Sequence, residues 1–170
     1  RRGELFYQEG RRLLTAEVNA VVEGLRLGGA DTIYVKDAHG TGVNLLVADL
    51  DPDVMLVQGG ATMDKRFPGL DASFDAALLV GYHAMAGTEA AIRDHTFSSK
   101  AYTNMSLNGQ DVGEIAIDSL LFGLHRVPVV FVSGDDKTCK EARETLGTDI
   151  TTYETKQGLG RQCYSWLTKT

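Results

Sequence analysis

The sequence has few cysteines, no cluster of basic residues and no long apolar run, and each absence argues against a class of protein. The two cysteines, Cys139 and Cys163, lack CxxC spacing, so we expect no disulfide framework. The net charge of −6 and the pI of about 5.2 argue against a surface for nucleic acid or for an anionic membrane. The longest apolar runs, such as 76–80 and 127–132, are too short to cross a bilayer. We therefore expect no nucleic-acid partner and no membrane association, and, since no signal peptide is apparent, a cytoplasmic location.

Several common catalytic and cofactor motifs are also absent. The glycine pairs match neither a P-loop nor a GxGxxG fingerprint, which leaves nucleotide binding with little support. The sequence contains no GxSxG nucleophile elbow, and neither cysteine has a convincing base partner. The chemistry must therefore be sought in other residue types.

What the sequence does contain is an alternation of helix and strand patterns. Residues 5–27 are predicted to form a helix, because Val18, Val21, Val22 and Leu25 fall at i, i+3, i+4 and i+7. The other predicted elements are strands at 32–35, 54–57, 76–82, 127–132 and 149–153, and helices at 44–50, 113–124 and 137–146.

Two further patterns complete the predicted architecture. In the helix at 113–124, one apolar face is predicted to consist of Ile117, Leu120, Leu121 and Leu124. Asn108-Gly109, after residues 100–107, predicts a tight type I′ hairpin. The expected fold class is therefore α/β, a mostly parallel sheet with helices on both faces and an inserted β-hairpin.

Length and composition fit one globular domain. The 170 residues are 43% hydrophobic, and they show no internal repeat and no clean boundary, so we expect a single α/β domain over residues 1–170. The sequence begins at Arg1 without Met, and the tail at 157–170 has no clear period. We expect a partial domain, truncated at both ends.

Polar residues gather where the apolar strands end. The strand at 32–35 runs into Asp37 and His39, the strand at 76–82 into His83, and the strand at 127–132 into Asp135 and Asp136. Because ligands of open α/β sheets bind outside the carboxyl ends of the strands, we expect these residues to share one rim of the sheet. Imidazole and carboxylate groups together suit zinc or a similar divalent ion.

Other interpretations of these residues remain open when each is taken alone. A single histidine at a strand exit is commonly a hydrogen-bonded surface residue. His125 closes a helix, where it interacts favourably with the helix dipole. Glu114 lies in the first turn of a predicted helix, where acidic residues are favoured as caps.

Five short motifs resemble, in order and at similar spacing, those of a known family. They are Val35-Lys36-Asp37-Ala38-His39, Gly81-Tyr82-His83-Ala84-Met85-Ala86-Gly87-Thr88, Asp94-His95-Thr96, Asn108-Gly109-Gln110-Asp111-Val112-Gly113-Glu114 and Ser133-Gly134-Asp135-Asp136. The segment resembles the zinc-dependent D-aminopeptidase family found with bacterial dipeptide-transport operons.

The resemblance implies a binuclear zinc hydrolase that removes D-amino acids from the N-termini of short peptides and works as a ring-like homo-oligomer. By motif, His39, His83 and Glu114 match metal ligands of the family, and His95 matches its catalytic histidine. The expected cofactor is zinc, two ions per chain in the complete protein. The resemblance gives no role to Asp37, Asp135 or Asp136 and identifies no substrate-binding residue.

One departure from the family leaves two alternatives open. The family's first strand ends in an Asp-x-Glu pair that binds the metals, and nothing in this segment matches it. The first alternative is a related metal-dependent hydrolase that acts on another small amide. The second is a metal-poor, non-catalytic member that serves in binding or assembly.

Overall fold

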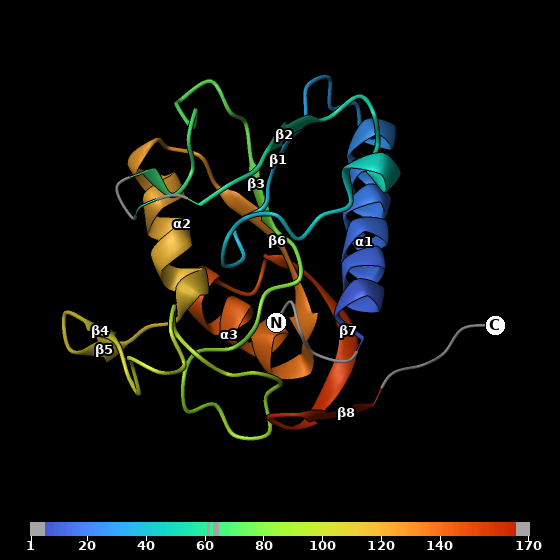
Figure 1. Ribbon diagram of the computed structural model, residues 1–170. Coiled ribbons are helices and arrows are strands. Elements are labelled where there is room, and N and C mark those ends of the chain that lie inside the picture. Colours follow the sequence, from blue (N-terminus) through green and yellow to red (C-terminus); the bar gives the residue numbers. More distant parts are fainter. Residues whose placement is uncertain (1–5, 61, 63–64, 166–170) are drawn as a thin grey trace. The chain divides into compact units, whose positions relative to one another are not determined.

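The computed structural model describes residues 6–60, 62 and 65–165 (Figure 1). The chain divides into two compact units, Arg1–Gly69 and Leu70–Thr170. No helix in the described residues is both long and apolar enough to cross a membrane.

The first unit contains one long helix and a short parallel strand pair. Helix α1 (Tyr7–Leu27) buries Thr15, Val18 and Val22, so the predicted helix is confirmed over its described residues. Strand β1 (Tyr34–Lys36) pairs in parallel with β2 (Met55–Val57). The helix predicted at 44–50 is only a 3-10 turn, η1 (Val47–Asp49).

The second unit is built on a four-stranded sheet of order β3-β6-β7-β8. Strands β3 (Ala77–Leu79), β6 (Val129–Asp135) and β7 (Thr151–Gly160) are parallel, whereas β8 (Cys163–Ser165) is antiparallel to β7. The mostly parallel α/β arrangement is thereby confirmed. The tail pattern at 157–170 predicts no element, but residues 157–160 continue β7 and 163–165 form β8, which pairs with them; residues 166–170 lie outside the described residues.

Helices α2 (Glu114–Leu124) and α3 (Asp136–Leu146) belong to the same unit, and α3 packs on β6 and β7 (Figure 1). The predicted inner face of α2 is wrong. Leu120 is 53% and Leu124 79% exposed, whereas Ile115, Asp118 and Phe122 are buried. Apolar residues surround almost the whole circumference of α2, so periodicity alone does not select one face.

The predicted hairpin is confirmed at its turn. Strands β4 (Ser106–Leu107) and β5 (Gln110–Asp111) pair antiparallel. Asn108 has φ 52° and Gly109 φ 82°, the positive angles that a type I′ turn requires at both central residues. The strands are much shorter than the 100–107 pattern suggests.

Candidate metal centre

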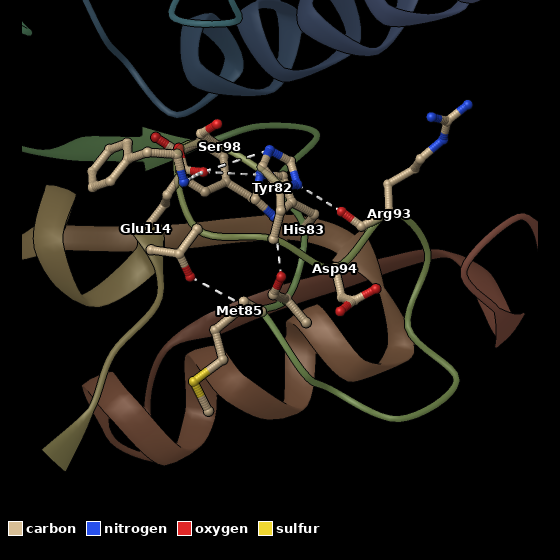
Figure 2. A network of polar contacts seen from close by, with 12 residues as sticks. Tyr82, His83, Met85, Arg93, Asp94, Ser98 and Glu114 are labelled. Atoms are coloured by element: carbon tan, nitrogen blue, oxygen red, sulfur yellow. Dashed lines mark hydrogen bonds and ion pairs between the residues drawn. The ribbon is translucent and has the colours of Figure 1, made fainter. Parts of the chain in front are cut away.

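His83 is presented at the carboxyl end of β3. The chain leaves the strand through Gly81, whose amide donates to the Ser133 hydroxyl at 2.9 Å, and Tyr82, whose amide donates to the Ser133 carbonyl at 2.9 Å. These two bonds tie the exit of β3 to β6. His83 Nδ1 lies 3.1 Å from the Ala84 carbonyl, which can only accept, so Nδ1 is protonated. The other ring nitrogen, Nε2, lies 3.3 Å from Glu114 Oε1 and can donate to it when the ring is also protonated there (Figure 2).

His95 lies in the loop that follows and meets His83 face to face. The two rings stack with centroids 3.8 Å apart and an interplanar angle of 20°. His95 Nδ1 lies 2.6 Å from the Arg93 carbonyl, so it is protonated like Nδ1 of His83, and Nε2 lies 3.8 Å from Glu114 Oε1. Both rings thus turn Nε2 toward one carboxylate.

The loop around His95 has an unusual backbone. Ala90, Arg93 and Phe97 have φ of 57°, 54° and 55°, in the left-handed region that side chains other than glycine rarely adopt. Such conformations persist only where surrounding contacts impose them, and they are concentrated at functional sites.

Glu114 is the first residue of α2 and is only 9% exposed. Its Oε1 accepts a hydrogen bond from the Phe97 amide at 2.8 Å, so the carboxylate holds the loop next to His95. The carboxylate also faces both imidazoles, which the capping interpretation leaves unexplained.

These three side chains fit a divalent metal. Each of His83, His95 and Glu114 offers one ligand atom, and the three atoms lie within 4.8 Å of one another. Backbone carbonyls accept from Nδ1 of both rings, which holds each ring in place, as is typical of histidines that bind a metal through Nε2. Two imidazole nitrogens and a carboxylate oxygen form a donor set that zinc accepts.

The two histidines differ in their pKa. Burial lowers the pKa of His83, but the hydrogen bond and the charge of Glu114 outweigh burial, and the net pKa is raised. Burial also lowers the pKa of His95, with a further decrease from the charge of His83, and here the net pKa is lowered. His95 is thus the imidazole that stays neutral more readily, as proton acceptance requires.

His39 belongs to the first unit, in the turn after β1. Its carbonyl accepts from the Gly42 amide at 2.9 Å and from Asn44 Nδ2 at 2.6 Å. The buried Asp37 carboxylate accepts from the Asn44 side chain and from the Asn44 and Leu45 amides. Asp37 therefore stabilises the turn that carries His39. Whether His39 joins the metal site stays a prediction.

Asp135 and Asp136 hold backbone segments together. Asp135 Oδ1 caps α3 through the Thr138 amide at 2.8 Å and hydroxyl at 2.6 Å, and Oδ2 accepts from the Ile92 amide at 2.7 Å. Asp136 Oδ1 accepts from the Gly158 amide at 2.8 Å. These contacts give the Ser-Gly-Asp-Asp motif a role in shaping the loop that carries His95.

Three residues that support the site were not predicted from the sequence. Arg161 donates to both the carbonyl and the carboxylate of Asp94, and its own carbonyl accepts from the Arg93 amide at 3.0 Å. Asp118 is fully buried and accepts from the Tyr82 hydroxyl at 2.7 Å. The third is Glu141, which the sequence does not distinguish from the other charged residues of the helix predicted at 137–146.

The fold is α/β, and it brings His83, His95 and Glu114 together near the end of β3 and the start of α2. A protein of this class has a candidate divalent-metal centre. The family model for D-aminopeptidase matches residues 1–170. The curated D-aminopeptidase of Bacillus subtilis (strain 168) is 32% identical over 165 residues, which are 97% of this chain and 59% of that protein.

A solved structure gives the same result. The structure described as "Zn-dependent D-aminopeptidase DppA from Bacillus subtilis, a self-compartmentalizing protease" matches with a TM-score of 0.89 and 32% identity over 98% of this chain. The chain belongs to the D-aminopeptidase family. It spans 59% of the curated relative and 60% of the chain in the solved structure.

Proposed function

We propose that this chain is part of a zinc-dependent peptidase that removes D-amino acids from the N-termini of short peptides. The observation that carries the proposal is the cluster of His83, His95 and Glu114, whose ligand atoms lie within 4.8 Å of one another. The relative of similar fold is described as a zinc-dependent D-aminopeptidase, which supplies the metal and the substrate class.

Within the cluster we assign separate roles. His83 and Glu114 are the metal ligands, because Nε2 of His83 lies nearest the carboxylate and the Ala84 carbonyl keeps its proton on Nδ1. When bound, zinc lowers the pKa of a water molecule and polarises the scissile carbonyl. His95 accepts a proton at Nε2 and releases it to the leaving amine, because the Arg93 carbonyl holds the proton of the neutral ring on Nδ1 and leaves Nε2 as the acceptor. The Phe97 amide holds the Glu114 carboxylate in place.

A second zinc ion and the ligand role of His39 rest on the family resemblance. The described residues of the second unit supply His83 and Glu114, and a binuclear site requires more ligands than these two. We propose that the complete protein binds two zinc ions, with His39 as a ligand.

The proposals on substrate and assembly rest on the relatives. The short-peptide substrate is inferred from the relatives, which are described as D-aminopeptidases. The relative is described as self-compartmentalizing, and we propose a ring-like homo-oligomer that encloses the site.

Metal analysis of three histidine variants tests the site. His83→Ala should reduce bound zinc, whereas His95→Ala should keep its zinc and lose peptide hydrolysis. His125→Ala, at an exposed position after α2, is the matched control and should change neither. Loss of zinc from His95→Ala would make His95 a ligand and overturn its assigned role.

A substrate panel tests the reaction. D-aminoacyl peptides and amides should be hydrolysed and their L counterparts spared. A clear preference for L residues or for other amides would favour the related amidohydrolase. Purified protein without zinc and without hydrolysis would favour a non-catalytic member.

A further inference from the structure

Glu141 is a buried carboxyl group on the inner face of α3. It is 7% exposed, and its neighbours Thr138, Cys139 and Ala142 are also buried. An apolar side chain would suit such a position, because a buried carboxyl group is costly unless its oxygens are hydrogen-bonded. Packing alone therefore does not account for the residue.

One oxygen of Glu141 holds the segment that carries His83. Oε2 accepts from the Met85 amide at 2.7 Å, two residues after His83, and Met85 is one of the labelled residues of the network in Figure 2. The bond links α3 to the exit of β3 and fixes the chain just beyond the first imidazole.

The other oxygen lies against the segment that carries Glu114. A Cβ on Gly113 would lie 2.3 Å from Glu141 Oε1 and 2.7 Å from the Met85 Cβ. Only glycine allows this close approach, at the residue directly before Glu114. Oε1 itself is buried and has no hydrogen-bond partner among the described residues. Burial raises the pKa of Glu141, which is consistent with a carboxyl group enclosed at this position.

We propose that Glu141 is a positioning residue that sets the placement of His83 relative to Glu114. The side chain joins two backbone segments that are distant in sequence, the exit of β3 and the start of α2, through Met85 and Gly113. This proposal rests on the proposed function, because the placement of His83 relative to Glu114 matters only if the two residues bind the same metal ion. Mutation of a residue that positions a metal ligand without binding the metal typically weakens metal affinity by about 10- to 100-fold.

Glu141→Gln and Glu141→Leu separate hydrogen-bond geometry from mere bulk. The amide oxygen of glutamine can still accept from the Met85 amide, whereas leucine fills the volume and leaves that N–H without its acceptor. Glu144→Leu is the control on the same helix, at a side chain that is 63% exposed and pairs with Lys140.

The first readout needs no metal. The stacked rings of His83 and His95 shift each other's proton resonances, so NMR of the metal-free protein reports their placement directly. In Glu141→Leu the ring signals should move toward those of unstacked histidine, and the Met85 amide should lose protection from hydrogen exchange. Glu141→Gln and Glu144→Leu should keep both signatures. Unchanged ring signals in Glu141→Leu would overturn the proposal.

The second readout is zinc affinity by competition with a chromophoric chelator. Glu141→Leu should bind zinc about 10-fold more weakly or worse, and Glu141→Gln within about threefold of wild type. Equal losses in the two variants would also overturn the proposal, because the acceptor geometry would then not matter. A wild-type protein that binds no zinc would refute the proposed function, while the metal-free NMR comparison would still decide the role of Glu141.

Discussion

Removing the Asp135 side chain should destabilise the second unit strongly, because one carboxylate serves two separate backbone segments. Asp135 is 2% exposed. Its Oδ1 caps the first turn of α3 at Thr138, and its Oδ2 accepts from the Ile92 amide at 2.7 Å. Asp135→Ala removes the cap and leaves the Ile92 amide without this acceptor.

The magnitude follows from the two losses. An N-cap aspartate replaced by alanine costs about 1 kcal/mol of stability. A buried hydrogen bond to a charged group contributes roughly 2 kcal/mol. The expected loss in the free energy of unfolding is therefore about 3 kcal/mol, a large part of the stability of an ordinary domain. Asp135→Asn should lose less, because its Oδ1 can still cap α3.

Urea denaturation followed by circular dichroism measures this loss from the shift in midpoint at constant m-value. Asp149→Ala, at an exposed position of the same unit, is the control and should stay within about 0.5 kcal/mol of wild type. A loss below about 1 kcal/mol for Asp135→Ala would show that the bond to Ile92 contributes little, and the reasoning would fail.

Three further perturbations test other parts of the second unit. Gly113→Ala should destabilise the protein by about 1–3 kcal/mol in the same denaturation assay, because the added Cβ would lie 2.3 Å from a buried carboxylate oxygen; unchanged stability would contradict the close approach. Cys163 is exposed and should react rapidly with a thiol reagent, whereas burial raises the pKa of Cys139 to about 11 and should protect it until unfolding; rapid reaction of both thiols would refute this. In NMR titrations of the metal-free protein, His83 should titrate above and His95 below the ordinary histidine pKa, and the reverse order would contradict the geometry. The raised pKa of His83 contributes stability that is fully present below its unfolded-state pKa and is lost as the pH rises through its folded-state pKa. The lowered pKa of His95 has the opposite effect, so the free energy of unfolding falls as the pH decreases through the unfolded-state histidine pKa.

Much of the fold could be predicted because its strands carry local patterns. Continuous apolar runs mark β3 and β6, and their ends place His83 and Asp135 at the carboxyl edge of one sheet. The positive φ angles at Asn108-Gly109 likewise follow from residue type alone.

Other parts depend on tertiary contacts that leave no local pattern. The inner face of α2 is set by what it packs against, so Ile115 and Phe122 are buried while Leu124 is exposed. Glu141 looks like any charged residue of an amphipathic helix until its contact with Met85 is known. The ring stacking of His83 on His95 depends on a loop whose conformation is imposed by partners far along the chain.

The loop that bears His95 also has a consequence for the order in which the protein matures. The residues that hold this loop come late in the sequence. Asp135 binds the Ile92 amide from 43 positions further along the chain, and Arg161 binds Asp94 from 67 positions further along. Both imidazoles and the carboxylate are therefore synthesised well before the residues that bring them to their final places. Contacts between such distant positions form slowly. A nascent chain that stops within β7 would already contain His83, His95 and Glu114, but it would lack Arg161 and the contacts of Arg161 with Asp94 and Arg93.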